Sequence, residues 1–249
     1  MMKNDINENK ALSQTSVTGS VYKILNLYAC LGGNRYKWDK VAKEKGIEIE
    51  VTAIEYDKEL ARMYQERFPN DIVIVCDAHQ YLLENFKNFD FIWSSPPCPS
   101  HSRARYWNSS NYDTTTQPVF PDMKLYEEIL FLQHYYRNGK FVVENVIPYY
   151  EPLIPAIKRD RHLYWTNFNL PNKLSSRNIS GVVSQAKDEL KELCKIHEID
   201  VSDYKGTQPM LKIARNLVDY EAGRTIFETV LGIEKKYNVN QVSIFDAIG

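Results

Sequence analysis

The chain has few cysteines, almost no net charge and no long apolar run, and each of these shortages excludes a class of protein. Its four cysteines, at positions 30, 76, 98 and 194, form no C-x-x-C pair and do not predict a disulfide framework. Free thiols in a reducing, cytoplasmic compartment are the simplest interpretation. No segment reaches the length of a membrane-spanning helix, and the polar first residues do not resemble a signal peptide. The net charge of −1 restricts any nucleic-acid binding to local patches.

The chain does contain enough apolar sequence for one large domain, because 43% of its 249 residues are hydrophobic. Short apolar runs alternate with amphipathic stretches of helical spacing. This alternation predicts an α/β fold with a doubly wound, mostly parallel sheet. The predicted strands are 21–27, 49–54, 72–76, 89–93, 141–143 and 162–168, and the predicted helices cover about 35–45, the stretch up to Phe68, 79–87, 123–137, 184–198 and 216–232.

Composition divides the chain into four expected regions. Residues 1–20 form a disordered polar tail, and residues 21–170 form the main domain. Residues 171–207 are polar and rich in serine and lysine, which is typical of a small separate unit. Residues 208–249 resume a helical pattern and are expected to pack back on the main domain.

A proline-rich turn around Cys98 is the most informative segment. It follows the apolar run 89–93, and prolines at 96, 97 and 99 fix its backbone. Ligands of open α/β sheets bind beyond the carboxyl ends of the strands, so a thiol at this place is typical of a positioned nucleophile. The predicted strand 141–143 leads directly into Glu144. The sequence therefore predicts a nucleophile and an acid at two neighbouring strand ends.

The first three predicted strands end in residues that suit a nucleoside. The turn after the first strand contains Gly32 and Gly33, which allow the backbone to approach a ligand closely. Glu55 ends the second strand and suits a ribose diol, and Asp77 ends the third and suits an adenine amino group. This ordered series predicts a nucleoside-containing cofactor.

In the same order along residues 22–232, these segments resemble the motifs of the DNA cytosine-5 methyltransferases, in the compact form found in phages and restriction–modification systems. YACLGG at 28–33 resembles F-x-G-x-G-G, PCPSHS at 97–102 resembles P-C-x-x-[FH]-S, and ENV at 144–146 is the family's E-N-V. RDR at 159–161 resembles R-x-R, and RNLV at 215–218 resembles G-N-x-V. The resemblance implies a Rossmann-like class I methyltransferase domain over 21–170, with 171–207 as a small target-recognition region.

The resemblance also implies a reaction at C5 of a cytosine flipped out of double-stranded DNA, with S-adenosylmethionine as cofactor and no metal or membrane involved. Cys98 would add to C6, which needs a lowered thiol pKa or help from a local base. Glu144 would supply a proton at N3, Arg161 would hold O2, and Ser102 would lie near the target phosphate. The implied cofactor residues are Tyr28, Ala29, Gly32, Gly33, Glu55, Asp77, Pro97, Asn216 and Val218.

Basic and aromatic residues alternate in the polar loop that follows the proline-rich turn. Such a mixture suits phosphate contacts and stacking on nucleotides. Other basic residues follow in the R-x-R segment and in the small unit. The candidate nucleic-acid contacts are Arg103, Arg105, Tyr106, Trp107, Arg159, Lys173 and Arg177.

Several alternatives remain open at this stage. The substrate of such an enzyme could be tRNA, and SPPC at 95–98 also resembles the S-P-P-Y of amino-methyltransferases. A zinc site at Cys98 and His101 would need an H-x-E partner, which the sequence does not contain. A non-catalytic module that binds S-adenosylmethionine or DNA is a further possibility, because Cys30 stands where the family prefers glycine and Asn26 where it prefers aspartate. No oligomeric state or recognition sequence is predicted.

Overall fold

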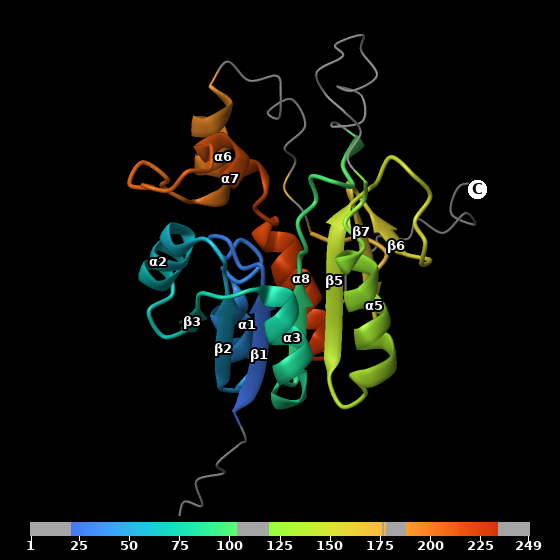
Figure 1. Ribbon diagram of the computed structural model, residues 1–249. Coiled ribbons are helices and arrows are strands. Elements are labelled where there is room, and N and C mark those ends of the chain that lie inside the picture. The colour runs from blue at the N-terminus through green and yellow to red at the C-terminus, as the bar shows by residue number, and fades with distance from the viewer. Residues whose placement is uncertain (1–20, 104–119, 176, 178–187, 234–249) are drawn as a thin grey trace, which may run out of the picture.

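The computed structural model describes residues 21–103, 120–175, 177 and 188–233. These residues contain a seven-stranded sheet with the strand order β3-β2-β1-β4-β5-β7-β6 (Figure 1). Strands β1 to β5 are paired in parallel, and β7 is antiparallel to both of its neighbours. The doubly wound, mostly parallel sheet predicted from the sequence is confirmed. The strands are β1 (Tyr22–Leu27), β2 (Ile49–Ile54), β3 (Ile72–Ile74), β4 (Phe91–Ser94), β5 (Lys140–Val146), β6 (Ile157–Arg159) and β7 (His162–Thr166).

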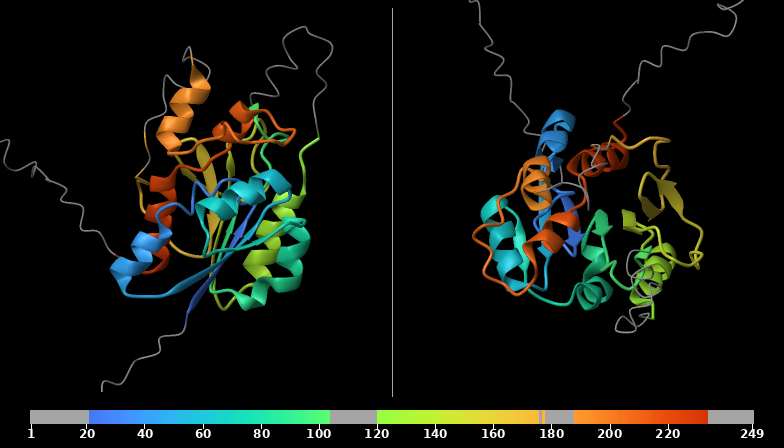
Figure 2. Two further views of the ribbon diagram at one scale, coloured as in Figure 1. Left: turned by 90° about the vertical axis from the view of Figure 1, so that its left-hand side faces the viewer. Right: turned by 90° about the horizontal axis from the view of Figure 1, so that it is seen from above.

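Helices cover both faces of the sheet. Helices α1 (Trp38–Lys45) and α8 (Tyr220–Val230) lie on one face, and α3 (Ala78–Asn85) and α5 (Lys124–Tyr135) lie on the other (Figures 1 and 2). A single 3-10 turn, Phe86–Asn88, follows α3. Helix α2 (Lys58–Arg67) joins β2 to β3. Two short helices, α6 (Glu189–His197) and α7 (Met210–Arg215), lie beyond the carboxyl ends of the strands (Figure 1).

The core explains why the strands are almost continuously apolar. Side chains of a strand alternate between the two faces, and helices cover both faces of this sheet. In β1, Ile24 packs with Trp38 of α1 and Phe227 of α8, whereas Leu25 packs with Leu82 of α3 on the opposite face. All of these side chains are fully buried. The sheet is therefore a rigid platform whose carboxyl edge carries the candidate site.

The turn after β1 is fixed by a buried ion-pair network, and α1 therefore begins later in the sequence than predicted. Gly32 has a positive φ of 67°, and Arg35, which is only 3% exposed, follows it. The Arg35 guanidinium donates to both carboxylate oxygens of Asp71 at 2.9 and 2.8 Å and also pairs with Asp39. Because residues 32–37 are held in this turn, the helix begins at Trp38 and not near residue 35 as predicted.

The small unit expected over 171–207 packs against the main domain where the structure describes it. Leu31 of the β1 turn and Leu60 of α2 share an apolar cluster with Val201, Ile213 and Leu217. Helix α6 begins at Glu189, and α7 was not predicted. The boundaries of the four regions remain predictions, and the expected tail (1–20), the start of the helix expected over 184–198 and the last residues (234–249) lie outside the described residues.

Candidate active site

The loop that carries Cys98 is anchored to the strand that carries Glu144. Strand β4 ends at Ser94, and the carbonyl oxygen of Cys98 accepts hydrogen bonds from the backbone N–H groups of His101 and Ser102, both at 3.0 Å. The buried side chain of Asn145 donates to the carbonyl oxygen of Pro96 at 2.9 Å. The asparagine of the E-N-V segment therefore fixes the Cys98 loop beside the strand that carries Glu144.

The carboxylate of Glu144 is buried and has a partner on each oxygen. Glu144 is 6% exposed, and its Oε2 accepts a hydrogen bond from Ser95 Oγ at 3.0 Å. Ser95 in turn accepts one from Trp93 Nε1 at 2.9 Å. The other oxygen, Oε1, lies 3.4 Å from Nε2 of His162 on β7. These contacts fix the orientation of the carboxylate, and sequence reasoning did not find Ser95 or His162.

The thiol of Cys98 is electrostatically coupled to Glu144. Burial raises the pKa of Cys98, and the charge of Glu144 raises it further, while Lys212 of α7 lowers it. The net direction is upward, so the thiol holds its proton more tightly than a free cysteine does. The pKa of Cys98 is therefore not lowered in a way that would favour the thiolate. Neutralisation of Glu144 would remove one of the two causes that raise this pKa.

The two arginines of the R-x-R segment have different environments. Arg161 is exposed in the turn between β6 and β7, next to Asp160, whose φ is 47°. The guanidinium of Arg159 donates to the carbonyl oxygen of Pro171 at 2.7 Å and to that of Leu170 at 3.5 Å. Arg159 thus ties the β6–β7 hairpin to the segment after β7, and its contact with nucleic acid stays a prediction.

Two backbone N–H groups hold the carboxylate of Glu55 at the end of β2. Its Oε2 accepts a hydrogen bond from the backbone N–H of Cys30 at 2.8 Å, and its Oε1 accepts one from that of Asp57 at 2.9 Å. Burial raises the pKa of Glu55. A carboxylate offers about four lone-pair sites, so each oxygen keeps acceptor capacity for a ribose hydroxyl. The position beyond β2 therefore fits a nucleoside diol.

The β1 turn places further predicted cofactor residues at the same edge. Tyr28 and Cys30 have positive φ values of 56° and 47°, and Ala29 between them is buried. The hydroxyl of Tyr28 donates to Glu128 Oε1 at 2.5 Å, away from the turn's backbone. A Cβ atom on Gly33 would lie 2.4 Å from the carbonyl oxygen of Val218. The turn therefore has Val218 as an immediate neighbour.

Asp77, Pro97 and Asn216 are more open to solvent. The side chain of Asp77 is 51% exposed, and its Oδ1 accepts a hydrogen bond from the backbone N–H of Gln80 at 2.9 Å as the N-cap of α3. Pro97 is exposed in the Cys98 loop, and Asn216 is exposed after α7. Contacts of these residues with the cofactor stay predictions.

The remaining candidate nucleic-acid residues are only partly described. Arg103 is exposed and donates from Nε to the carbonyl oxygen of Pro148 at 3.0 Å, and Lys173 is exposed. Arg177 donates to Asp219 at 3.1 Å, and its guanidinium carbon lies 3.6 Å from the centroid of the Tyr220 ring. These contacts hold Arg177 against the N-terminus of α8. Arg105, Tyr106 and Trp107 lie outside the described residues.

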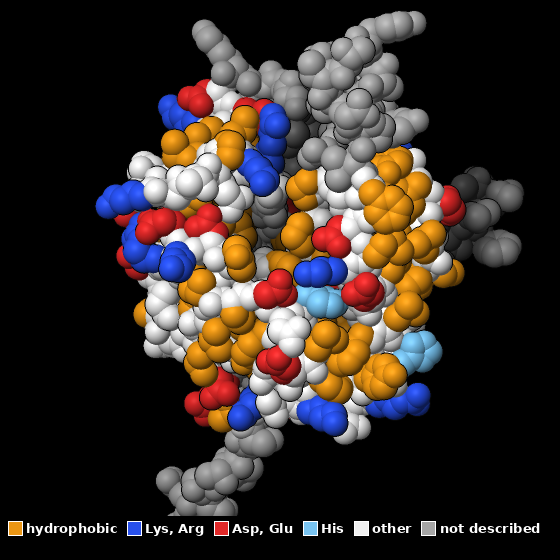
Figure 3. Space-filling model, in the orientation of Figure 1, with side chains coloured by type: hydrophobic (Ala, Val, Ile, Leu, Met, Phe, Trp, Pro, Cys, Tyr) orange, Lys and Arg blue, Asp and Glu red, His pale blue; other side chains and the backbone are white. Residues whose placement is uncertain are grey.

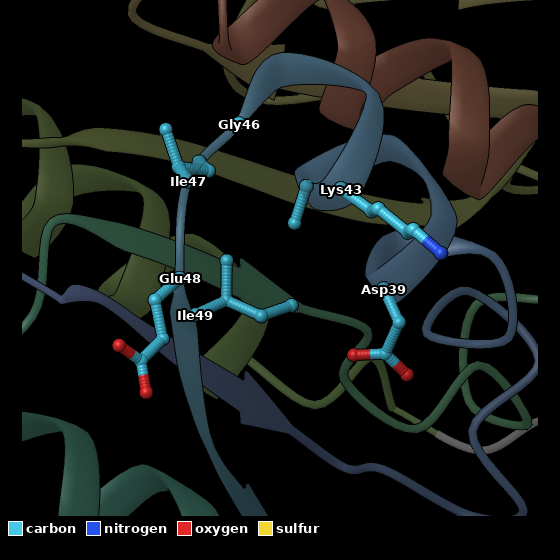
Figure 4. A pocket seen from close by; sticks show the side chains of 7 residues that line it. Asp39, Lys43, Gly46, Ile47, Glu48 and Ile49 are labelled. Carbon is cyan, nitrogen blue, oxygen red and sulfur yellow. The ribbon is translucent and has the colours of Figure 1, made fainter.

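The surface is hollowed at the carboxyl edge of the sheet. In Figure 3 this hollow lies between the α6–α7 unit and the part of the surface that β5 and α5 form, and Lys and Arg side chains gather on the rim of the α6–α7 unit. Another, shallow pocket lies between the end of α1 and the start of β2, at the opposite edge of the sheet (Figure 4). It is lined by Asp39, Ala42, Lys43, Gly46, Ile47, Glu48 and Ile49, none of which is a predicted site residue.

The described residues contain neither a candidate metal site nor a candidate membrane-spanning helix. No group of three or more His, Cys, Asp or Glu side chains in this part of the chain is placed to hold a metal ion. None of the helices within the described ranges is long and apolar enough to cross a membrane.

The family model for the C-5 cytosine-specific DNA methylases matches residues 22–147, just over half of the 249-residue chain. The matched segment runs from β1 through the Cys98 loop to the E-N-V segment at the end of β5. The fold and this match define an S-adenosylmethionine-dependent methyltransferase of class I. The chain belongs to the C-5 cytosine-specific DNA methylase family, and its methyl donor is S-adenosylmethionine.

Two solved structures that this chain matches are covered over nearly their whole length. A mutant of DNMT2 from Spodoptera frugiperda is 14% identical, with a TM-score of 0.47 over 85% of this chain and 99% of its own. The methyltransferase EhMeth from Entamoeba histolytica is 10% identical, with a TM-score of 0.47 over 87% of this chain and 100% of its own. A search of curated protein sequences finds no match.

Proposed function

We propose that the protein methylates C5 of cytosine in double-stranded DNA through a covalent bond between Cys98 Sγ and C6 of a flipped-out base. The observation that carries the proposal is the Asn145–Pro96 hydrogen bond, which holds the Cys98 loop against the strand of Glu144. A thiol and a buried carboxylate at neighbouring strand ends are the two groups that this chemistry requires. Arg161 and Ser102 complete the proposed catalytic set.

The roles of these side chains follow from the low nucleophilicity of C5. When the Cys98 thiolate forms a bond to C6, the electron pair of the C5–C6 double bond becomes available at C5. Glu144 donates a proton to N3 and so makes C6 electrophilic enough for the attack. Arg161 holds the O2 atom of the base. Once C5 carries the methyl group, its proton passes to water, the C5–H electron pair restores the C5–C6 double bond, and the C6–S bond breaks with its electron pair left on Cys98 Sγ.

A duplex hides C6 and N3 of a cytosine within the base stack, so the target base must leave the stack before Cys98 can reach it. Arg103 and Arg105 are proposed to contact phosphates of the DNA, and Tyr106 and Trp107 to stack on its nucleotides. Residues 171–207, including Lys173 and Arg177, are proposed as the target-recognition region. Because the net charge is −1, these local contacts must supply the attraction for phosphate.

The residues at the β1, β2 and β3 ends fit the cofactor. When bound there, S-adenosylmethionine would supply an electrophilic methyl group. Glu55 would hold the ribose, Asp77 the adenine, and the backbone of the β1 turn would lie beside the rest of the cofactor. Gly33 lies against Val218, and this packing would join the last motif, Asn216 to Val218, to the same cofactor site.

Methyl transfer from labelled S-adenosylmethionine to duplex DNA, single-stranded DNA and tRNA tests the proposal, with identification of the product nucleosides. We expect labelled 5-methyl-2′-deoxycytidine from duplex DNA, and none with the Cys98→Ala variant. Label in tRNA alone would contradict DNA as the substrate. N4-methylcytosine as the product would refute the covalent route through Cys98.

A further inference from the structure

His162 is the outer neighbour of the buried Glu144 carboxylate. Its Nε2 lies 3.4 Å from Glu144 Oε1, and the side chain of His162 is 37% exposed whereas that of Glu144 is 7% exposed. Val146 is paired with His162 in the antiparallel β5–β7 ladder, so the register of the sheet brings the imidazole alongside Glu144. The Tyr164 ring meets the imidazole edge-on with centroids 6.4 Å apart.

This arrangement gives the two carboxylate oxygens different surroundings. Oε2 accepts a hydrogen bond from the Ser95 hydroxyl at 3.0 Å, and Ser95 accepts one from the indole of the buried Trp93 at 2.9 Å. Oε1 faces a side chain that is open to solvent on its other side. A buried carboxylate that must act as an acid needs a source of protons, and imidazole exchanges its proton with water between about pH 5 and 8. A carboxyl group alone keeps its proton only below about pH 4.

We propose that His162 is a positioning residue that orients Glu144 Oε1 and keeps an exchangeable proton beside it. The proposal rests on the proposed function of Glu144 as the proton donor to N3. The Nε2–H bond of the imidazolium breaks, an O–H bond forms at Glu144, and the electron pair stays on Nε2. Glu144 then passes the proton to N3. When Cys98 leaves C6, N3 returns its proton to Glu144, and Glu144 returns it to Nε2 of His162.

Arg159 is paired with His162 in the β6–β7 ladder, and its guanidinium donates to the carbonyl oxygens of Pro171 and Leu170. The phenol of Tyr164 and the thiol of Cys98 are the groups near Glu144 that could carry a proton in place of the imidazole. Burial and the charge of Glu144 raise the pKa of Tyr164 well above its ordinary value, with Asp160 and Asp219 adding to the effect, so this phenol stays neutral. Cys98 is affected by Glu144 in the same direction. A proton on Glu144 therefore also favours the thiolate of Cys98, because it removes a negative charge from the neighbourhood of the sulfur.

The pH dependence of turnover tests the proposal. We expect His162→Gln to lower kcat about tenfold at pH 7.5, less than the roughly 10²–10⁴-fold of direct general acid–base help, because His162 acts through Glu144. As the pH is raised, the activity of the variant should begin to fall at a lower pH than that of the wild type, because the variant has no imidazole to carry a proton beside Glu144. The KM for DNA and the affinity for S-adenosylmethionine should stay within about twofold of wild type, since His162 contacts neither in this account.

A control and a rescue separate this role from a structural one. His134→Gln changes an exposed histidine of α5 and should have the wild-type profile. Added imidazole should restore turnover of His162→Ala, because the lost side chain was open to solvent, and should leave the wild type unchanged. A wild-type pH profile in His162→Gln, or no rescue of His162→Ala, would overturn the role of His162. The formation of 5-methylcytosine by wild type but not by Cys98→Ala would still support the proposed function.

Discussion

Removal of the Glu55 carboxylate should weaken binding of S-adenosylmethionine by a predictable amount. Glu55 is 9% exposed and is held by the backbone N–H groups of Cys30 and Asp57 at 2.8 and 2.9 Å. A hydrogen bond to a charged group contributes about 1.5–3 kcal/mol, so loss of the ribose contact should lower the affinity about tenfold to a hundredfold. Because Glu55→Ala also releases the backbone of Cys30, which has a φ of 47°, we expect the upper part of that range.

Asp77 provides the comparison that makes this prediction specific. Its side chain is 51% exposed, so water screens its contact with adenine more strongly than it screens the ribose contact of Glu55. Asp77→Ala should therefore lower the affinity by a smaller factor, close to tenfold. Glu84→Ala, which removes an exposed carboxylate of α3, serves as the control. Isothermal titration calorimetry measures all three variants, and wild-type affinity in both Glu55→Ala and Asp77→Ala would refute the assignment of these strand ends to the cofactor.

Three further perturbations test other parts of the account. Glu144→Gln keeps the shape of the side chain but cannot donate a carboxylic proton, so turnover should fall about 10²-fold or more with cofactor affinity nearly unchanged, and unimpaired turnover would assign the proton to another group. Gly33→Ala places a Cβ atom 2.4 Å from the carbonyl oxygen of Val218 and should cost about 1–3 kcal/mol in urea unfolding, and an unchanged free energy of unfolding would contradict this close approach. Burial, with a smaller effect of Arg177, lowers the pKa of His197 to about 4, so the unfolded chain binds more protons between that value and 6.5. Stability should therefore fall by up to about 3 kcal/mol as the pH falls through this window, and His197→Gln should remove that slope in urea titrations at several pH values.

The fold could be predicted where an apolar run is sufficient to specify an element. Strands β1, β2 and β4 are such runs, and their ends set the positions of Glu55 and Cys98. Strand β6 was missed because its three residues, Ile157–Arg159, include two basic side chains and form a strand only through pairing with β7. Helix α7 was missed because it has six residues, and Ile213 in it is buried by neighbours distant in sequence.

The sequence predicted Cys98 and Glu144 as site residues, but it did not predict the residues that contact them. Strand ends brought Cys98 and Glu144 together in the sequence interpretation, and the structure joins them through Asn145 and Pro96. The contact of His162 with Glu144 depends on the register of an antiparallel pair, which a sequence pattern does not contain. The backbone contacts of Arg159 were hidden for the same reason, since they join segments that meet only after folding.

The bond between Cys98 and the cytosine is the central claim, and DNA that contains 5-fluorocytosine tests it most directly. Fluorine at C5 cannot leave as a proton, so the covalent bond to C6 should persist after methyl transfer. With S-adenosylmethionine present, the wild-type protein should form an adduct with this DNA that survives denaturation, as should Cys30→Ala and Cys194→Ala. Cys98→Ala should form none, and an adduct with that variant would contradict the account.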